Sequence, residues 1–255
     1  MRPTSRNQPP RTRRGARPRH LANPPITEAQ IDFRLVQSGA VAIESIKRIA
    51  DGFASAYPKA EDQPVLQLRV DVGPGSVQSS SFGFGGIIRR SNDGRDVLQC
   101  RADGCAYSRL APYRNWEEAL PRALDIWKAY LKVTAVAAVR VTVRYINVIP
   151  IPAVASDLGR YLVYPPNAPL SRRSTIRGFL STVTLFETDS NVYASVIQTA
   201  LSGPAIDQVP IAVNIEAYRD NVEPAAVKQT LGILRSTKNR LFFGSLTPYA
   251  LRRYS

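Results

Sequence analysis

The stretch NWEEALPRALDIWKAYLKVTAVAAVRVTVRYINVIPIP, residues 115–152, contains a helix pattern followed by a strand pattern. In its first part, apolar side chains recur every three or four residues, as in an amphipathic helix. They are Trp116, Leu120, Ala123, Leu124, Trp127, Tyr130 and Leu131. Asn115 and Glu118 have the spacing of a helix-capping box. The second part, residues 138–152, has the pattern of a β-strand and ends in prolines.

The same two patterns continue on both sides of this stretch. ITEAQIDFRL, residues 26–35, alternates apolar and polar side chains and predicts a half-buried strand. A helix pattern follows and is expected to stop at Pro58. Further strands are expected at residues 65–72, 81–90, 96–110, 178–188, 191–201 and 211–220, with a last helix from Pro224. SNDG, residues 91–94, has the composition of a hairpin turn.

These elements predict an α+β fold. We expect a largely antiparallel mixed sheet of about seven or eight strands and three main helices, in the order βαβββαβ and then βββα. The helices should pack on one sheet face. Residues 1–23 are rich in Arg and Pro and predict a disordered arm. Residues 24–255 are then a single domain, with halves of about 24–152 and 153–255.

Positive charge is concentrated at the N-terminus. The chain carries a net charge of +14, and residues 1–20 supply half of it through seven arginines without an acid. Such an arm is suited to phosphate contacts without sequence readout. The candidate nucleic-acid-binding residues are Arg11, Arg13, Arg14, Arg17 and Arg19, with a second small cluster at Arg172, Arg173 and Arg177.

Few residues are suited to catalysis or to metal binding. His20 is the only histidine and lies in the arm, so we expect no Ser-His-Asp or Cys-His centre, no metal site and no cofactor. Cys100 and Cys105 are expected to lie in one strand on opposite faces, as buried apolar side chains rather than a disulfide. The glycines at 83, 85 and 86 lack the rest of a phosphate-loop motif and predict a kinked strand or bulge.

Polar side chains share the face of the predicted sheet that lies opposite the helices. We expect acids and arginines from several strands to converge there: Glu28, Asp32, Arg34, Arg69, Arg144 and Glu216. Such a group could hold a metal-bound phosphate. The alternatives are a solvated face or an ion-pair network that fixes strand register, in which Arg144 pairs with Glu117 or Glu28.

Two blocks of sequence, SRLAPYRNWE and RYINVIPIP, lie between the strand expected at residues 26–35 and the strand expected at residues 211–220. This order of segments is recognisable. The residues concerned are Pro25, Glu28, Ser108, Arg109, Tyr113, Trp116, Glu117, Arg144, Tyr145, Ile146, Asn147, Ile149, Pro152, Asn214, Ile215 and Tyr218. With them, residues 23–250 resemble a sporadically distributed bacterial protein family without an assigned function. Within these motifs we expect Arg109, Tyr113, Trp116, Glu117, Tyr145 and Asn147 to be structural.

Three functions follow as hypotheses. The first is a non-enzymatic interaction or accessory protein with a protein partner, a homodimer included; the resemblance implies a mobile-element or defence context. The second is weak, sequence-independent nucleic-acid binding through the arm. The third is a metal-dependent phosphohydrolase on the polar sheet face. No membrane-spanning segment is predicted, and the free cysteines favour a cytoplasmic protein.

Overall fold

The computed structural model describes residues 21–36, 41–70, 78–152, 157–167, 176, 178–201 and 208–255, without the side chains of 65–70 and 78–83. Within these residues nine strands form one sheet, in the order β2-β3-β4-β5-β1-β6-β9-β8-β7. The strands are β1 Ile26–Val36, β2 Lys59–Val70, β3 Gln78–Arg90, β4 Asp96–Arg101, β5 Gly104–Leu110, β6 Ala138–Pro152, β7 Leu180–Glu187, β8 Val192–Ala200 and β9 Gln208–Val222. The helices are α1 Ile43–Asp51, α2 Trp116–Leu131, α3 Val227–Ser245 and α4 Pro248–Leu251, with short 3-10 turns at Leu158–Arg160 and Pro224–Ala226.

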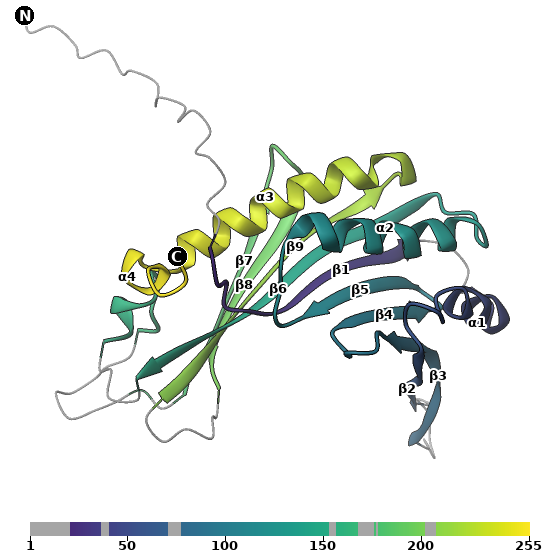
Figure 1. The fold of residues 1–255 in the computed structure, drawn as a ribbon, viewed down its shortest axis with the longest axis horizontal. Helices are drawn as coiled ribbons and strands as arrows, with labels where there is room; N and C mark the ends of the chain where they lie inside the picture. The colour runs from purple at the N-terminus through teal and green to yellow at the C-terminus, as the bar shows by residue number, and fades with distance from the viewer. Residues whose placement is uncertain are drawn as a thin grey trace, which may run out of the picture.

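Three helices cover one face of the sheet (Figure 1). α1 packs on β3 and β4, α2 packs on β5 and β1, and α3 packs on β6, β9 and β8. Apolar side chains from this face and from the helices form one continuous core. Inside it, the fully buried ring of Phe33 stacks on Trp127 of α2, with 5.1 Å between ring centroids. The predicted α+β class is confirmed, and every neighbouring pair of strands is antiparallel.

The first strand occupies the middle of the sheet. β1 pairs with β5 on one side and with β6 on the other, although both partners lie far along the chain. Ala29, Ile31 and Phe33 of β1 face the helices and are buried. The alternation predicted for this strand is therefore present, because one of its faces lies against the core.

The predicted strand over 96–110 is two strands, and the expected number of strands was too low. The chain turns back at Ala102 and Asp103, so that β4 pairs with β5. Gly104 follows the turn with φ of 141°, a conformation that suits glycine. As a result Cys100 and Cys105 lie directly opposite each other across two strands rather than on opposite faces of one strand. Both are buried free thiols, and burial raises the pKa of Cys100 to about 12.

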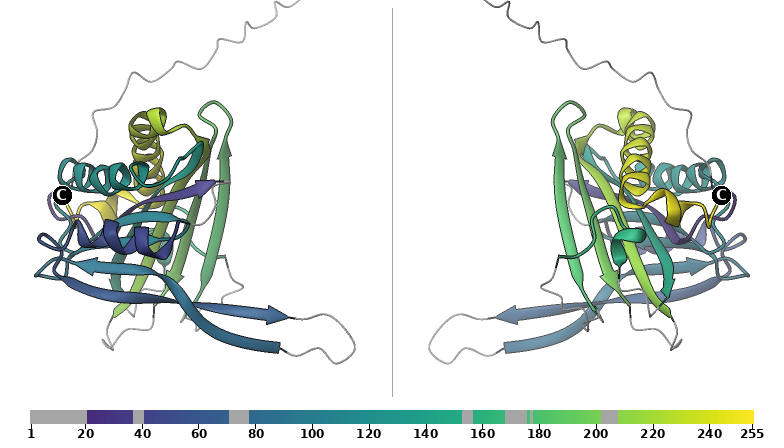
Figure 2. Two further views of the ribbon diagram at one scale, coloured as in Figure 1. Left: turned by 90° about the vertical axis from the view of Figure 1, so that its right-hand side faces the viewer. Right: turned by 90° about the vertical axis from the view of Figure 1, so that its left-hand side faces the viewer.

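The hairpin of β2 and β3 differs from the prediction at its start. α1 ends at Asp51 rather than running to Pro58, and β2 begins at Lys59. The register shifts between Gln63 and Pro64 because Gly85 is an extra residue in β3, so the glycine-rich stretch forms a bulge as predicted. Beyond this bulge the hairpin projects away from the rest of the sheet (Figure 2).

The C-terminal part of the sheet carries a second apolar cluster. It joins Ile149 and Ile211 of β6 and β9 to Phe242 of α3 and to Leu251 of α4. Leu21 packs in the same cluster, and the Asn23 N–H donates to the carbonyl of Tyr254, so both ends of the described chain meet here. Among the described residues, no helix has the length and apolar character needed to cross a membrane.

Candidate ligand pocket between α2 and α3

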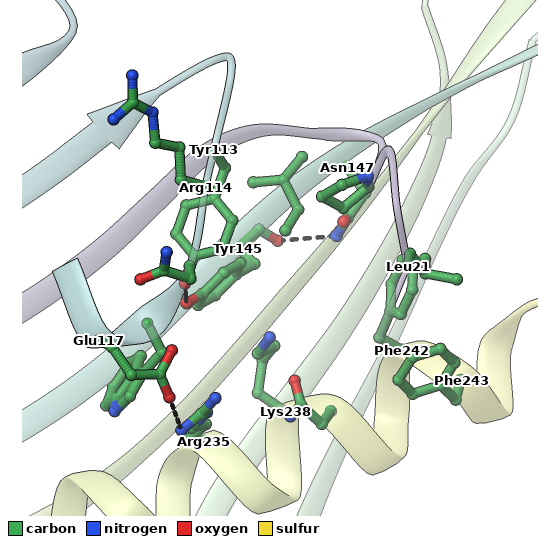
Figure 3. Close-up of a pocket in the computed structure, with 15 residues that line it drawn as sticks. Leu21, Tyr113, Arg114, Glu117, Tyr145, Asn147, Arg235, Lys238, Phe242 and Phe243 are labelled. Carbon is green, nitrogen blue, oxygen red and sulfur yellow. Dashed lines mark hydrogen bonds and ion pairs between the residues drawn. The ribbon is translucent and has the colours of Figure 1, made fainter. Parts of the chain in front are cut away.

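A cavity of about 260 Å³ opens between the start of α2, the middle of α3 and strand β6. Figure 3 shows the side chains that surround it. β6 contributes Tyr145 and Asn147, which are two residues apart and so point to the same face of the sheet. α3 contributes Arg235, Lys238 and Phe242 at helical spacing, which places them on one side of the helix. The remaining walls are formed by Tyr113, Arg114, Asn115, Trp116, Glu117 and the segment from Leu21 to Ile26.

Lys238 is the most unusual side chain of the pocket. It is only 7 % exposed, and Figure 3 shows it extending from α3 toward Tyr145. Its Nζ lies 3.5 Å from the centre of the Tyr145 ring, and no described residue gives it an ion pair or a hydrogen bond. Burial, together with the positive charge of Arg235, lowers the pKa of Lys238 to about 7. Among the described residues this amino group has no counter-ion, and it carries its positive charge mainly below about pH 7.

Two tyrosines form the polar wall opposite this lysine. The hydroxyl groups of Tyr113 and Tyr145 are 2.7 Å apart and share one hydrogen bond. Burial raises the pKa of Tyr113 to about 12 and that of Tyr145 well above its ordinary value. Both phenols are thus protonated near neutral pH. Since one hydrogen bond uses one proton, the accepting hydroxyl keeps an O–H for another acceptor.

The charges at the rim are paired. Arg235 Nη1 lies 3.1 Å from Glu117 Oε1, and its guanidinium lies 5.4 Å from the centre of the Trp116 ring. Arg114 is mostly exposed and lies 3.9 Å from Glu118. Glu117 is the one acid among the lining residues, against the three cations Arg114, Arg235 and Lys238. The cavity therefore has an excess of positive charge, and its only unpaired cation among the described residues is Lys238.

Asn147 is a polar residue in an otherwise apolar row of β6. Its Nδ2 donates to the carbonyl of Val213 on β9 at 3.0 Å, and the side chain is 1 % exposed. This bond fixes the orientation of the amide. The Asn147 side chain lines the cavity on the same face as Tyr145, where an amide can hydrogen-bond a polar ligand.

Six motif residues were expected to have a structural role. Five of them line this cavity: Tyr113, Trp116, Glu117, Tyr145 and Asn147. The sixth, Arg109, lies elsewhere and pairs with the buried Asp96 at 2.9 Å. Burial by itself raises the pKa of Asp96, but hydrogen bonds from Tyr107, Arg122 and Arg109 outweigh it, and the pKa lies below its ordinary value. Arg109 thus belongs to a buried ion-pair group between β4, β5 and α2.

The polar sheet face brings together only part of the predicted constellation. Glu28, Asp32, Arg34, Arg144 and Glu216 lie on the face opposite the helices, on the adjacent strands β1, β6 and β9. Arg69 lies on β2, an edge strand that three other strands separate from β1. Alternation indicates which face a residue occupies, but it does not give the order of the strands.

Two of the three acids on this face, Asp32 and Glu28, are paired with arginines, whereas no ion pair joins Glu216 to another described residue. Asp32 bonds Arg101 at 2.7 Å and lies 3.4 Å from Arg34. Glu28 lies 3.6 Å from Arg144 and accepts from Ser108. Among the described residues there is no group of three or more His, Cys, Asp or Glu side chains that could hold a metal ion. This geometry matches the ion-pair network that was the alternative to a metal-phosphate site.

The basic residues proposed for nucleic-acid contacts lie outside the described part of the chain. This holds for Arg11, Arg13, Arg14, Arg17 and Arg19 and for the loop residues Arg172, Arg173 and Arg177. The arm joins the fold at Leu21, which lines the α2–α3 pocket. Comparison with known proteins found no match: no protein-family model fits the chain, and no curated protein matches its sequence.

Proposed function

We propose that this chain is a non-enzymatic binding protein that holds a small anionic ligand in the pocket between α2 and α3. One observation carries the proposal. The ammonium group of Lys238 is buried at the wall of a cavity and has no counter-ion among the described residues. The one interaction partner of this amino group among the described residues is the Tyr145 ring. Burying a charge without a counter-ion is costly, and an anionic ligand would supply the counter-ion.

The chemistry of the walls narrows the ligand class. Arg235 is already neutralised by Glu117, so one positive charge remains inside, which suits a monoanion such as a carboxylate better than a doubly charged phosphate. The free phenol proton of the tyrosine pair can donate to a carboxylate oxygen. Trp116 and Phe242 offer apolar surface for a planar or hydrocarbon body. The cavity has the volume of roughly nine water molecules at ~30 Å³ each.

Three features support a binding role rather than catalysis. The tyrosines are held protonated, the single acid of the pocket is paired with Arg235, and Asp32 and Glu28 of the polar sheet face are paired with arginines. The tyrosines can donate hydrogen bonds that orient a ligand without losing a proton to it, and Lys238 supplies the charge that neutralises it. The proposal keeps the non-enzymatic character expected from the sequence, with a small anionic ligand in place of the expected protein partner. In this proposal the motif residues on which the resemblance to the bacterial family rests take part in ligand binding.

Thermal unfolding with a panel of small ligands tests this function. We expect benzoate, phenylacetate or a short aliphatic carboxylate at about 100 times its dissociation constant to stabilise the protein by ~2.7 kcal/mol, which raises Tm by roughly 5–10 °C. The matching neutral amides should have no effect. The gain should weaken above pH 7, because Lys238 loses its proton there and no longer attracts an anion.

The matched control uses another lysine of the same helix. Lys228 is exposed on α3, away from the cavity. Lys238→Met should abolish the ligand-induced rise in Tm, whereas Lys228→Met should retain it. If no carboxylate raises Tm, or if the rise survives Lys238→Met, the proposed ligand site is wrong.

Sequence-independent nucleic-acid binding through the N-terminal arm is the second candidate function. Its support is the charge of residues 1–20, which is +7 without a single acid. Replacing the seven arginines by Gln keeps the length of the arm and removes its charge. The variant should elute from heparin at lower salt than the wild type, and its affinity for two unrelated duplexes should fall equally. Unchanged elution would exclude a role of the arm in phosphate binding.

A further inference from the structure

The outermost strand β7 has an exposed edge. It pairs with β8 on one side only, and no described residue pairs with its other side. Figure 2 shows this strand at the rim of the sheet, far from the β2–β3 hairpin. Its sequence from Leu180 to Phe186, LSTVTLF, has no charge, proline or glycine. Its large apolar side chains are exposed: 72 % for Leu180, 49 % for Val183 and 49 % for Phe186.

The opposite edge of the sheet is protected. β2 carries Lys59, Glu61 and Asp62, and then Pro64 beside the bulge. Charged side chains, proline and bulges are the usual means by which edge strands avoid pairing with other chains. β7 has none of them between residues 180 and 186. Its free backbone groups and apolar side chains are therefore available for the addition of another strand.

We propose that β7 pairs antiparallel with β7 of a second copy of this chain, about a two-fold axis at Val183. The interaction surface is separate from the ligand pocket and does not depend on it. In this register Val183 faces itself, Thr182 faces Thr184, and Leu180 faces Phe186. The two sheets would join into one continuous sheet across the axis.

The symmetry of the strand favours a second copy over an unrelated peptide. Leu180, Thr182, Thr184 and Phe186 lie on the polar sheet face, and Ser181, Val183 and Leu185 lie on the helix side. A two-fold axis through Val183 matches threonine with threonine and one large apolar residue with the other, as cross-strand pairs prefer.

Charge within the strand does not oppose this register. Two copies that each carry a net charge of +14 repel each other in general. The paired segment is neutral, and Glu187 falls just outside it, where it bonds Thr237 and Arg240 of α3. Self-pairing through β7 therefore brings no like charges face to face within the strand.

The oligomeric state of the full chain tests the proposal. Light scattering after size exclusion should give about twice the chain mass of 28.1 kDa. Val183→Lys should yield a monomer with unchanged circular dichroism, because the two-fold axis places the new charges against each other. Val163→Lys, at a 43 % exposed valine away from β7, should remain dimeric. A monomeric wild type at 100 μM, or a dimer that persists in Val183→Lys, would overturn the proposal.

Paired charges test the register even if the valine variant does not fold. Thr182→Lys with Thr184→Glu places opposite charges against each other twice across the axis, and should remain a dimer. Thr182→Lys with Thr184→Lys places like charges there and should be monomeric. If both double variants have the same oligomeric state, the register centred on Val183 is wrong.

Discussion

Lys238→Met is expected to stabilise the ligand-free protein near pH 7 by an amount on the order of 2–4 kcal/mol. The folded chain holds this lysine at a pKa of about 7, against 10.5 ordinarily, because its charge is buried without a counter-ion among the described residues. Methionine fills similar space and carries no charge. The same substitution should abolish carboxylate binding, so that stability and binding change in opposite directions. Chemical denaturation of both proteins without ligand measures the difference.

Lys238 also determines the direction in which the stability of the wild-type protein changes with pH. Between pH 7 and about 10 the unfolded chain holds the Lys238 proton and the folded chain does not, so wild-type stability rises with pH across this window. In Lys238→Met the rise should be smaller by the same few kcal/mol. The other titratable groups that line the cavity are Arg114, Arg235, Glu117, Tyr113 and Tyr145, and all five remain in the variant. Lys228→Met is the control and should leave the pH profile unchanged. A loss of stability at pH 7, or an unaltered pH slope, would contradict the prediction.

Gly104→Ala is expected to destabilise the fold by at least about 4 kcal/mol. A Cβ at this position would lie 1.9 Å from the carbonyl oxygen of Phe33, and the φ of 141° is itself unfavourable for alanine. Relief requires β5 to move away from β1 at the centre of the sheet. Urea denaturation measures the loss through the midpoint of unfolding.

Gly94→Ala separates the effect of the positive φ from the effect of the close contact with Phe33. Gly94 also has a positive φ, of 72°, but lies in the turn between β3 and β4 with no atom within 4 Å of a Cβ. Its substitution should cost only about 1–2 kcal/mol. Similar losses for both variants would show that backbone conformation, and not the contact with β1, explains the effect at Gly104.

Local patterns predicted much of the secondary structure. The alternation of β1 is present because one face lies on the core, and Asn115 caps α2 through the backbone N–H of Glu118, as the capping-box spacing indicated. The extra turn at Ala102 and Asp103 was missed although Asp103-Gly104 is a dipeptide typical of hairpin turns. The position of β2 in the sheet was missed for a different reason. The pairing of strands depends on contacts between segments distant in sequence, and the periodicity of one segment gives no information about them.

The pocket was predictable in part. Sequence blocks identified Tyr113, Trp116, Glu117, Tyr145 and Asn147, but not that they surround a cavity. Lys238 was overlooked although the pattern contained a signal. Val227, Leu231, Leu234 and Phe242 form the apolar stripe of α3, and Lys238 occupies the stripe position between the last two. A charged residue at a buried helical position is the kind of local inconsistency that marks functional sites.

The central place of β1 has a consequence for how the chain folds. β1 leaves the ribosome before its partners β5 and β6, which follow roughly 80 and 110 residues later, as the pairs Gln30–Ser108 and Gln30–Arg144 indicate. Contacts so distant in sequence slow folding, because a long loop must close before they form. We expect refolding in milliseconds to seconds rather than microseconds. Until β6 has been synthesised, one edge of β1 has no strand partner, and the nascent chain is exposed to aggregation.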